Sequence, residues 1–477
     1  MCGKIEETKG DARVNFQILS KLNKAINYPS EKNRIEQFPN SGGYVEIVQI
    51  NSREHWQKID ESLMGAIENY DVFIDALFGT GFSRPIEGGY RAILDFFNAI
   101  SYSKTVSRNL KHLIFSIDIP SGLNADLSEP IGENIQADLT VTFTAPKPAN
   151  VLAPASNFGG ELVIANIGSP QELIDASPSQ LFLAEREDAQ AWLEQTKFSN
   201  DSHKSARGRA LIVAGSKAMA GAAVLCANAA MRSGVGLVRV ATSESARTAV
   251  SAHALPEIMV AGLPETESGA ISEEALDKVQ ELSEKMNVVA VGSGLSSDDE
   301  STRKFVRSLV ENRKTPVVID ADGLNSLAPF DLQGSDNAPI ILTPHQGEFL
   351  KLLGIADKEA VKDRVEVVRE FSQKHNVILV LKGERNLIAA PDGRVVVVPT
   401  GNSGLGKAGS GDTLAGIITG FVGQADAMKI DVFETVVAAV YIAGMAGDIA
   451  AEKFGKRAML ASDVRDCLSE AFESITN

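Results

Sequence analysis

Residues 399–413 read PTGNSGLGKAGSGDT, in which five glycines and one carboxylate lie between a predicted strand and a predicted helix. Glycines let the backbone approach an anion, and the N-terminus of the following helix directs a positive partial charge at the same point. The stretch therefore predicts a phosphate site, with Asp412 beside it as a base for a hydroxyl that attacks a phosphoryl group. The alternative is that the glycines form only a tight connection between strand and helix.

Two familiar nucleotide-binding motifs overlap this loop, and each is incomplete. Residues 401–407 fit the G-x-x-x-x-G-K motif, but Ala408 stands where a P-loop has the hydroxyl residue that holds magnesium. Residues 404–409 fit G-x-G-x-x-G, but the sequence continues as a helix and lacks the second strand with its terminal acid. Neither a P-loop nor a dinucleotide-binding fingerprint is therefore predicted here.

Length and composition indicate a globular protein of two domains, because 477 residues exceed a single typical core and 44% of them are apolar. We find no run of about 18 apolar residues and no apolar signal segment near Met1, so a cytoplasmic protein without a membrane partner is expected. The three cysteines, Cys2, Cys226 and Cys467, are too scattered for a disulfide framework or a metal knuckle. The net charge of −16 disfavours nucleic acid as a partner, although backbone amides and one or two cations can still bind a nucleotide.

Apolar runs alternate with helical patterns along most of the chain, which predicts an α/β protein with parallel strands in both halves. In the first half the expected strands are 44–50, 72–78, 112–119, 139–143 and 162–167. In the second half they are 210–214, 237–241, 288–291, 317–319, 340–342 and 377–381, followed by a hairpin that turns at 391–393. Residues 184–205 are charged and polar, with one Trp192 and no strand pattern. We therefore expect a domain at 1–175, a linker at 176–204 and a second domain at 205–477.

Several predicted strands of the second half end in polar or glycine-rich segments, and the carboxyl ends of parallel strands are where such sheets bind ligands. These segments are 215–217, 292–295, 320–325, 343–348 and 382–386. In this order, with the 409–412 Gly-Ser-Gly-Asp loop last, they resemble the ribokinase-like ADP/ATP-dependent NAD(P)H-hydrate dehydratase family over residues 204–472. The resemblance implies a ribokinase-like α/β sandwich and a repair reaction. In that reaction the hydrated cofactor, (6S)-NADHX or (6S)-NADPHX, loses water and becomes NADH or NADPH again.

The resemblance also implies roles for individual residues. Asp412 is the expected catalytic base, and the amides of residues 409–411 neutralise the phosphoryl group in transit. The expected substrate-binding residues are Ala222, Gly294, His345 and Asp412. The expected residues for ATP or ADP are Lys382, Gly383, Glu384, Arg385, Asn386, Gly409, Ser410 and Gly411, with Glu348 organising Mg²⁺ through water.

Structural alternatives stay open for four of the charged and polar positions in this half. His345 could cap a helix or lie in the core, and Lys382 could be a solvated strand end. Asp320 and Asp322 could be helix N-caps or turn formers rather than ligands.

In the first half, residues 75–81 (DALFGTG) and 118–123 (DIPSGL) each follow an apolar strand. This half resembles the NAD(P)HX epimerase family, and that resemblance implies a Rossmann-like three-layer sandwich. It also implies a potassium ion near Asp75 and Ser121, and a proton-accepting role for Asp118 in epimerisation. The expected substrate contacts are Gly79, Thr80, Gly81, Phe82, Ser83, Arg84, Pro85 and Asp118.

The sequence departs from the epimerase pattern near Met1, where the family has an Asn-Asn-Gly-Gly-Asp loop. Residues 4–11 read KIEETKGD and retain only the final Gly-Asp. Two carboxylates in place of amides would repel a phosphorylated dinucleotide. We therefore expect an N-terminally incomplete domain with exposed apolar surface, for which epimerase activity and a purely structural role are equally supported.

Two other functions remain open at this stage. A vitamin or sugar kinase of the ribokinase superfamily would share the glycine loop and Asp412, and a non-catalytic nucleotide-binding scaffold would bind ATP without turnover. A homo-oligomer is expected in each case. The epimerase-like first half favours the repair enzyme over both.

Overall fold

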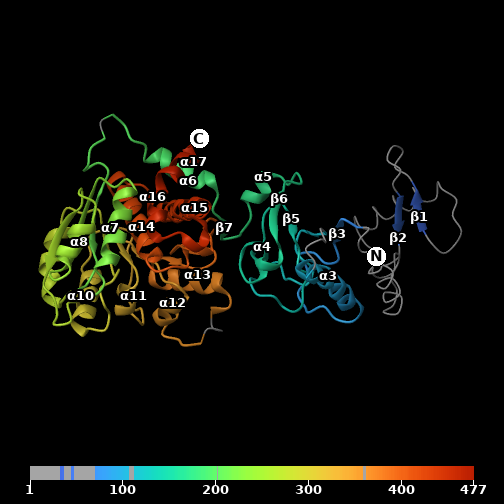
Figure 1. Ribbon diagram of the computed structural model, residues 1–477, viewed down its shortest axis with the longest axis horizontal. Coiled ribbons are helices and arrows are strands. Elements are labelled where there is room, and N and C mark those ends of the chain that lie inside the picture. The colour runs from blue at the N-terminus through green and yellow to red at the C-terminus, as the bar shows by residue number, and fades with distance from the viewer. Residues whose placement is uncertain are drawn as a thin grey trace. The chain divides into compact units, whose positions relative to one another are not determined.

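The computed structural model describes residues 33–36, 44–47, 70–106, 112–200, 202–357 and 361–476. The chain divides into two compact units, Met1–Ala176 and Ser177–Asn477 (Figure 1). Both units alternate strands with helices, so the predicted α/β class is confirmed.

The first unit contains a parallel four-stranded sheet in the order β3–β4–β5–β6. Its strands are β3 (Val72–Asp75), β4 (Leu113–Ile117), β5 (Leu139–Phe143) and β6 (Glu161–Ala165). Helix α3 (Gly89–Val106) buries Leu94, Phe97 and Ile100 in a cluster with Ile114 of β4. On β3, which lies at the edge of this sheet, Val72 and Ile74 are 41% and 59% exposed. The short helical segments that follow are α4 (Pro148–Val151), η3 (Ala155–Phe158) and α5 (Gln171–Asp175).

One predicted strand of the first half pairs differently from the expectation. Strand β2 (Tyr44–Ile47) pairs antiparallel with β1 (Asn33–Glu36) in a separate two-stranded sheet. The apolar run at 44–50 identifies a strand correctly, but an apolar run carries no information about its partner or direction.

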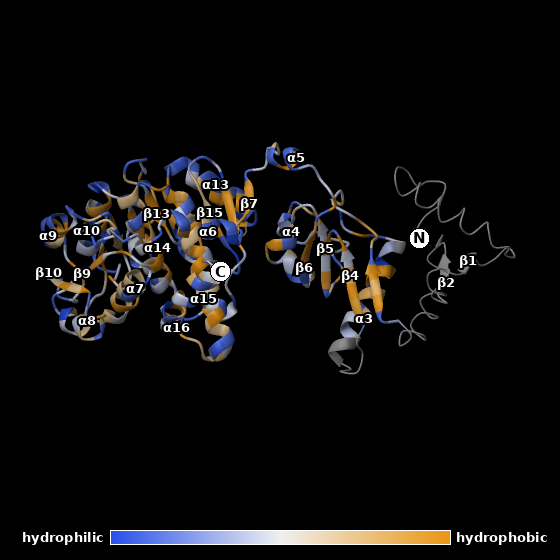
Figure 2. Ribbon diagram, turned by 90° about the horizontal axis from the view of Figure 1, so that it is seen from above, coloured by the Kyte–Doolittle hydropathy of each residue, from blue (hydrophilic) through white to orange (hydrophobic). Residues whose placement is uncertain are grey.

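The second unit is built on a ten-stranded sheet in the order β10–β9–β8–β11–β12–β13–β14–β15–β16–β7. Only β15 runs antiparallel to its neighbours. Its pairing with β16 is the predicted hairpin that turns at 391–393, and it also pairs antiparallel with β14. The central strands are largely hydrophobic (Figure 2) and nearly all their residues are buried, as expected for a parallel sheet covered by helices on both sides. The strands are β7 (Leu181–Leu183), β8 (Arg209–Val213), β9 (Leu237–Ser243), β10 (Met259–Leu263), β11 (Val288–Val291), β12 (Val317–Ile319), β13 (Ile340–Leu342), β14 (Ile378–Leu381), β15 (Asn386–Ala389) and β16 (Val395–Val398).

Helices α7 (Ala220–Arg232), α14 (Ser410–Met428) and α15 (Val432–Ala458) pack together against this sheet. At Gly416 the two backbones of α14 and α7 come so close that a methyl group would lie 2.2 Å from the Cys226 carbonyl oxygen. This contact fixes α14 with its N-terminus at the carboxyl edge of the sheet. The other helices are α8 (Arg247–His253), α9 (Leu276–Ser283), α10 (Glu300–Glu311), α11 (Asp322–Ser326), α12 (Gln346–Leu353), α13 (Arg364–His375), α16 (Ala461–Asp466) and α17 (Leu468–Thr476).

Helix α15 is long and apolar enough to cross a membrane by composition alone. However, 72% of its apolar window is buried inside the unit, which identifies it as a core helix. Two of the three cysteines, Cys226 and Cys467, are also buried here with free thiols.

The expected linker at 176–204 is largely a folded part of the second unit. Strand β7 pairs with β16, and helix α6 (Arg186–Gln195) inserts Trp192 into the core. The Trp192 ring stacks on Phe421 with centroids 4.1 Å apart, and its Nε1 donates a hydrogen bond of 3.0 Å to Thr435 Oγ1. The polar composition of this segment reflects its exposed side, while a single large aromatic side chain supplies much of its burial.

Candidate active site

Three neighbouring strands of the second unit end in polar side chains that contact one another. Lys382, the first residue after β14, donates from Nζ to Asp320 Oδ1 at 2.7 Å. Asp320 follows β12, and the same oxygen accepts a 2.8 Å hydrogen bond from Thr343 Oγ1 after β13. The Lys382 amide also bonds to the Pro344 carbonyl oxygen at 2.8 Å. The predicted convergence at the carboxyl edge of the sheet is therefore present for these segments.

The glycine-rich loop ends directly above this edge, at the N-terminus of α14. Gly409 precedes the helix with a φ of 90° and has no side chain to cap the first turn, where the Ser410 amide donates to the Lys407 carbonyl oxygen at 3.2 Å. A Cβ atom at Gly409 would lie 2.6 Å from Leu225 Cδ1, so the position also has no room for a larger residue. Uncapped amides at the positive end of a 19-residue helix form the kind of anion cradle that the sequence predicts.

Asp412 lies in the first turn of α14 and is partly buried. Burial raises the pKa of Asp412 from 3.8 to about 6, with Asp320 and Asp322 adding repulsion. A hydrogen bond with Ser293 and the charge of Lys382 oppose this rise. A carboxyl group with a pKa near 6 is a stronger base than an exposed aspartate and is still ionised at neutral pH, which suits general base catalysis.

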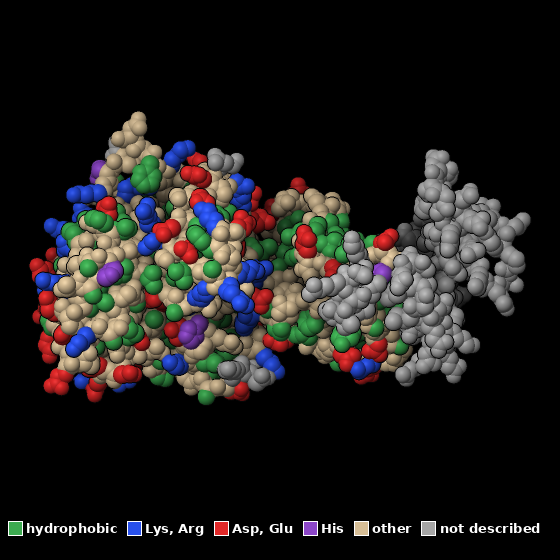
Figure 3. All heavy atoms as spheres, in the orientation of Figure 1, with side chains coloured by type: hydrophobic (Ala, Val, Ile, Leu, Met, Phe, Trp, Pro, Cys, Tyr) green, Lys and Arg blue, Asp and Glu red, His purple; other side chains and the backbone are tan. Residues whose placement is uncertain are grey.

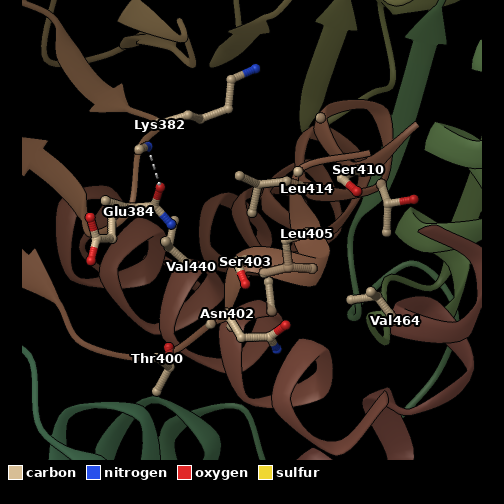
Figure 4. A pocket seen from close by; sticks show the side chains of 18 of the residues that line it. Lys382, Glu384, Thr400, Asn402, Ser403, Leu405, Ser410, Leu414, Val440 and Val464 are labelled. Carbon is tan, nitrogen blue, oxygen red and sulfur yellow. Dashed lines mark hydrogen bonds between the residues drawn. The ribbon is translucent and has the colours of Figure 1, made fainter. Parts of the chain in front are cut away.

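A cavity of about 860 Å³ opens beside the cradle, a volume within the usual range for small-molecule sites. Figure 4 shows that its walls come from the loop after β14, the glycine-rich loop, α14 and α15. Leu405, Leu414 and Val440 supply apolar surface. Eight of the predicted site residues line it: His345, Lys382, Gly383, Glu384, Arg385, Asn386, Ser410 and Gly411.

The predicted substrate residues Ala222 and Gly294 lie together but outside this cavity lining. Gly294 has a φ of 65°, and a Cβ atom there would be 2.8 Å from Ala222 Cβ. Ser293, the preceding residue, lowers the pKa of Asp412, so Asp412 lies near this pair. Asp412 is not part of the cavity lining, but its neighbours Gly411 and Thr413 are. Gly409 also lies outside the cavity lining, and it is the residue that precedes the first turn of α14.

His345 and Glu348 form the N-terminal cap of α12. His345 Nδ1 accepts hydrogen bonds from the amides of Gly347 and Glu348, at 3.0 and 3.2 Å. In return, Glu348 Oε2 accepts from the His345 amide at 2.9 Å. The capping alternative for His345 is therefore observed, yet its side chain is 61% exposed and also lines the cavity.

The other open alternatives are also resolved by these contacts. Lys382 is partly buried and forms an ion pair, so it is not a solvated strand end. Asp322 is a turn former, because its carboxylate accepts from the Ser296 amide at 2.9 Å and from Ser297 Oγ at 3.3 Å. Within the described ranges, no cluster of three His, Cys, Asp or Glu side chains is placed to hold a metal by itself.

Sequence reasoning missed Asp448, which holds the glycine-rich loop from the middle of α15. Its Oδ2 accepts from the Gly401 amide and its Oδ1 from Asn402 Nδ2, both at 2.9 Å. Asn402 in turn accepts from the Gly404 amide at 2.9 Å. A single carboxylate within the apolar run AGMAGDIAA is the signal that could have identified this residue.

In the first unit, Asp75 and Ser121 are brought together as the resemblance implies. Ser121 Oγ donates to Asp75 Oδ1 at 2.6 Å, and the Ser121 amide and Ser116 Oγ donate to Oδ2. Asp75 is fully buried. The predicted substrate segment, 79–85, directly follows on the loop after β3, and most of it is exposed. Residues 4–11 lie outside the described part of the chain.

Asp118 is less suited to accept a proton than the sequence predicts. Lys147 Nζ donates to Asp118 Oδ1, and Thr142 Oγ1 donates to the same oxygen at 3.0 Å. Burial alone would raise the pKa of Asp118, but the hydrogen bond from Lys147 and those from Phe143 and Thr142 lower it overall. Lys147 itself was not singled out from the sequence, although it lies only four residues after the end of β5.

Basic and acidic side chains are interspersed on the face of the second unit shown in Figure 3.

A parallel sheet with an uncapped helix N-terminus, a partly buried base and a nucleotide-sized cavity at its carboxyl edge defines an enzyme of the ribokinase-like class. The same fold occurs in a ribokinase-like superfamily protein from Enterococcus faecalis, which is 24% identical with a TM-score of 0.53 over 63% of this chain and 98% of that one.

Sequence comparison identifies the particular family. The family model described as NAD(P)H-hydrate dehydratase matches residues 210–470, and the one described as YjeF-related protein N-terminus matches residues 1–149. A bifunctional NAD(P)H-hydrate repair enzyme from Moorella thermoacetica is 37% identical over 97% of this chain and 79% of its own length. The chain belongs to the family of bifunctional NAD(P)H-hydrate repair enzymes.

A solved structure agrees with this assignment. It is the ADP/ATP-dependent NAD(P)H-hydrate dehydratase from Bacillus subtilis, co-crystallised with ATP and Mg²⁺. The two chains are 31% identical with a TM-score of 0.54, over 62% of this chain and 98% of the Bacillus chain. These findings favour the repair enzyme over the vitamin or sugar kinase.

Proposed function

We propose that the second unit dehydrates the hydrated cofactors NADHX and NADPHX at the expense of ATP or ADP. The observation that carries this proposal is the position of Asp412. It is a partly buried base in the first turn of α14. Its neighbours Gly411 and Thr413 line the nucleotide-sized cavity, and Ser293, the residue before Gly294, acts on its carboxyl group.

The proposed chemistry uses phosphorylation to turn a poor leaving group into a good one. Asp412 takes the proton of the ring hydroxyl as its oxygen forms a bond to the terminal phosphorus, and the bond from that phosphorus to the nucleotide breaks. The amides of residues 409–411 neutralise the charge on the phosphoryl group. The carbon–oxygen bond then breaks with loss of phosphate, the neighbouring ring carbon gives up a proton to the departing phosphate or to solvent, and the electrons of that carbon–hydrogen bond form the double bond that restores the conjugated ring. ATP, for example, leaves as ADP and inorganic phosphate, and NADHX leaves as NADH.

The nucleotide is proposed to occupy the cavity, with residues 382–386, 410 and 411 as its contacts, and Gly409 shaping the cradle. His345 and Gly294 would contact the hydrated cofactor, together with Ala222. Mg²⁺ would supply charge neutralisation between nucleotide phosphates. It keeps much of its water shell in such sites. This fits the described residues, since Glu384 is a carboxylate in the cavity lining, and Glu348, which caps α12, has its Oε2 4.0 Å from the ammonium of Lys382, another lining residue.

Incubation of the full chain with NADHX, ATP and Mg²⁺ tests this function directly. Recovery of dihydronicotinamide absorbance, with one phosphate released per NADH formed, is the expected result. Asp412→Asn is expected to lower turnover by a factor of about 100 to 10,000 while retaining nucleotide affinity. Accumulation of a phosphorylated vitamin or sugar would instead favour a kinase, and ATP binding without any turnover would favour a scaffold.

For the first unit we propose epimerisation of the two NAD(P)HX forms, with potassium bound near Asp75 and Ser121. The supporting observation is that the fully buried Asp75 has hydroxyl and amide partners, and no cationic side chain pairs with it among the described residues. A buried negative charge in that setting is balanced well by a cation. Thermal unfolding of the first unit at equal ionic strength should occur at higher temperature in K⁺ than in Na⁺, and Asp75→Asn should remove the difference.

The remaining expectations concern location and assembly. A cytoplasmic homo-oligomer without a nucleic acid or membrane partner is proposed. The net charge of −16 and the burial of α15 support the last two points. Sedimentation velocity of the purified chain measures the oligomeric state.

A further inference from the structure

Asp320 and Lys382 form a buried ion pair that no expected role of either residue explains by itself. The Asp320 side chain is 5% exposed and that of Lys382 is 19% exposed, with 2.7 Å between Oδ1 and Nζ. Thr343 Oγ1 holds the same Asp320 oxygen at 2.8 Å. The geometry of this ion pair is restricted, because Asp320 follows β12 and Lys382 follows β14, on either side of β13 in the sheet.

The pair lies against the first turn of α14. A methyl group placed on Gly411 would be 3.3 Å from Lys382 Nζ and 3.5 Å from Asp320 Oδ2. Lys382 also lines the nucleotide cavity, at the edge opposite Thr400 in Figure 4. The ammonium group therefore stands where the cavity meets the anion cradle, and Glu348 Oε2 is 4.0 Å away on its other side.

We propose that Asp320 is a positioning residue, which holds the Lys382 ammonium beside the first turn of α14 so that it neutralises the phosphoryl group during transfer. This inference rests on the proposed function. A lysine side chain has four flexible carbons, and a free ammonium would lose much of its effect through motion. Fixing it in advance removes that cost from the reaction itself.

The same pair acts on Asp412 through its charges. The groups that act on the Asp412 carboxyl are Ser293, Asp320, Lys382 and Asp322. The charge of Asp412 in turn helps to raise the pKa of the buried Cys226 thiol. The carboxylate of Asp320 disfavours ionisation of Asp412, while the ammonium of Lys382 favours it. Removing one partner therefore leaves the other uncompensated, and the two single changes have opposite effects on the base.

The test is the pH dependence of kcat for the full chain with NADHX and ATP, compared between Asp320→Asn and Lys382→Gln. The acid limb is expected to move down by about one pH unit in Asp320→Asn and up by about the same amount in Lys382→Gln. Both variants are expected to lose at least about tenfold in kcat at the plateau. Asp331→Asn is the matched control, because Asp331 is an exposed aspartate paired with Arg307 outside the site, and it should leave kcat and the acid limb unchanged.

A binding measurement separates this inference from the proposed function. Asp320→Asn is expected to weaken ATP about tenfold and to leave adenosine affinity unchanged, which also shows that the cavity is folded. Shifts of the acid limb in the same direction, or wild-type kcat and ATP affinity in Asp320→Asn, would overturn the positioning role. If the unmodified protein does not convert NADHX, the proposed function fails. The role of Asp320 is then still decided by whether Asp320→Asn weakens the affinity for ATP but not the affinity for adenosine.

Discussion

The Asp412→Asn variant is expected to be more stable than the unmodified protein at neutral pH. In the folded chain, burial raises the pKa of Asp412 to about 6, against 3.8 for an unperturbed side chain. A carboxyl whose pKa is higher in the folded state contributes its full stability below the unfolded value, and loses it as the pH rises through about 6. Ionised Asp412 therefore destabilises the folded second unit at pH values above about 6.

The magnitude follows from the two pKa values. A difference of about two pKa units, at about 1.36 kcal/mol for each, corresponds to roughly 3 kcal/mol at about pH 8 as an upper bound. At about pH 5 the same relation gives a destabilisation of roughly 1.5 kcal/mol, because the carboxyl is then mostly protonated in the folded state but mostly ionised in the unfolded state. Asparagine has nearly the same shape without the charge, so Asp412→Asn should recover most of this free energy.

Urea unfolding followed by tryptophan fluorescence measures the effect. The chain has two tryptophans, so a Trp56→Phe background leaves Trp192, which is buried in the second unit, as the sole reporter. The gain in unfolding free energy should be larger at about pH 8 than at about pH 5, by a factor of about two. The Asp331→Asn control should show no gain, because its Arg307 partner lowers the pKa of Asp331.

Two results would refute this reasoning. An unchanged or lower stability of Asp412→Asn at about pH 8 would mean that the ionised carboxylate is well compensated in the folded protein. An equal gain at both pH values would mean that the effect comes from packing or hydrogen bonding and not from ionisation.

Three further predictions concern the two sites. Dehydratase kcat should rise as the pH passes through about 6 and stay level above it, because the base must be ionised, and a pH–rate profile checks this. Asp448→Ala should raise the KM for ATP about tenfold with a smaller change in kcat, since the 401–402 loop loses two hydrogen bonds; steady-state kinetics would contradict this if kcat fell instead. Lys147→Met should raise the pKa of Asp118, which is lowered in part by the Lys147 hydrogen bond, and NMR titration of the carboxyl carbon measures the change.

Much of the second unit could be predicted because its signals are local. Apolar runs such as 288–291 and 340–342 specify strands buried on both faces, and both are strands of the sheet. Elements with weaker local signals were missed. Strand β7 has three residues, and its place beside β16 depends on a partner more than 200 residues away. The antiparallel pairing of β2 is a choice of partner that its own residues do not encode.

The amino-acid sequence alone determined the chemistry that is available: a glycine-rich loop before a helix, a lone acid in its first turn, and polar residues after buried strands. These are properties of neighbouring residues, which backbone geometry and alternation make readable. Only the tertiary structure decided how these groups act on one another. The ion pair of Lys382 with Asp320, the raised pKa of Asp412 and the hold of Asp448 on the loop each join residues distant in the chain. Burial and charge at a point in space depend on the whole fold, so no local pattern contains them.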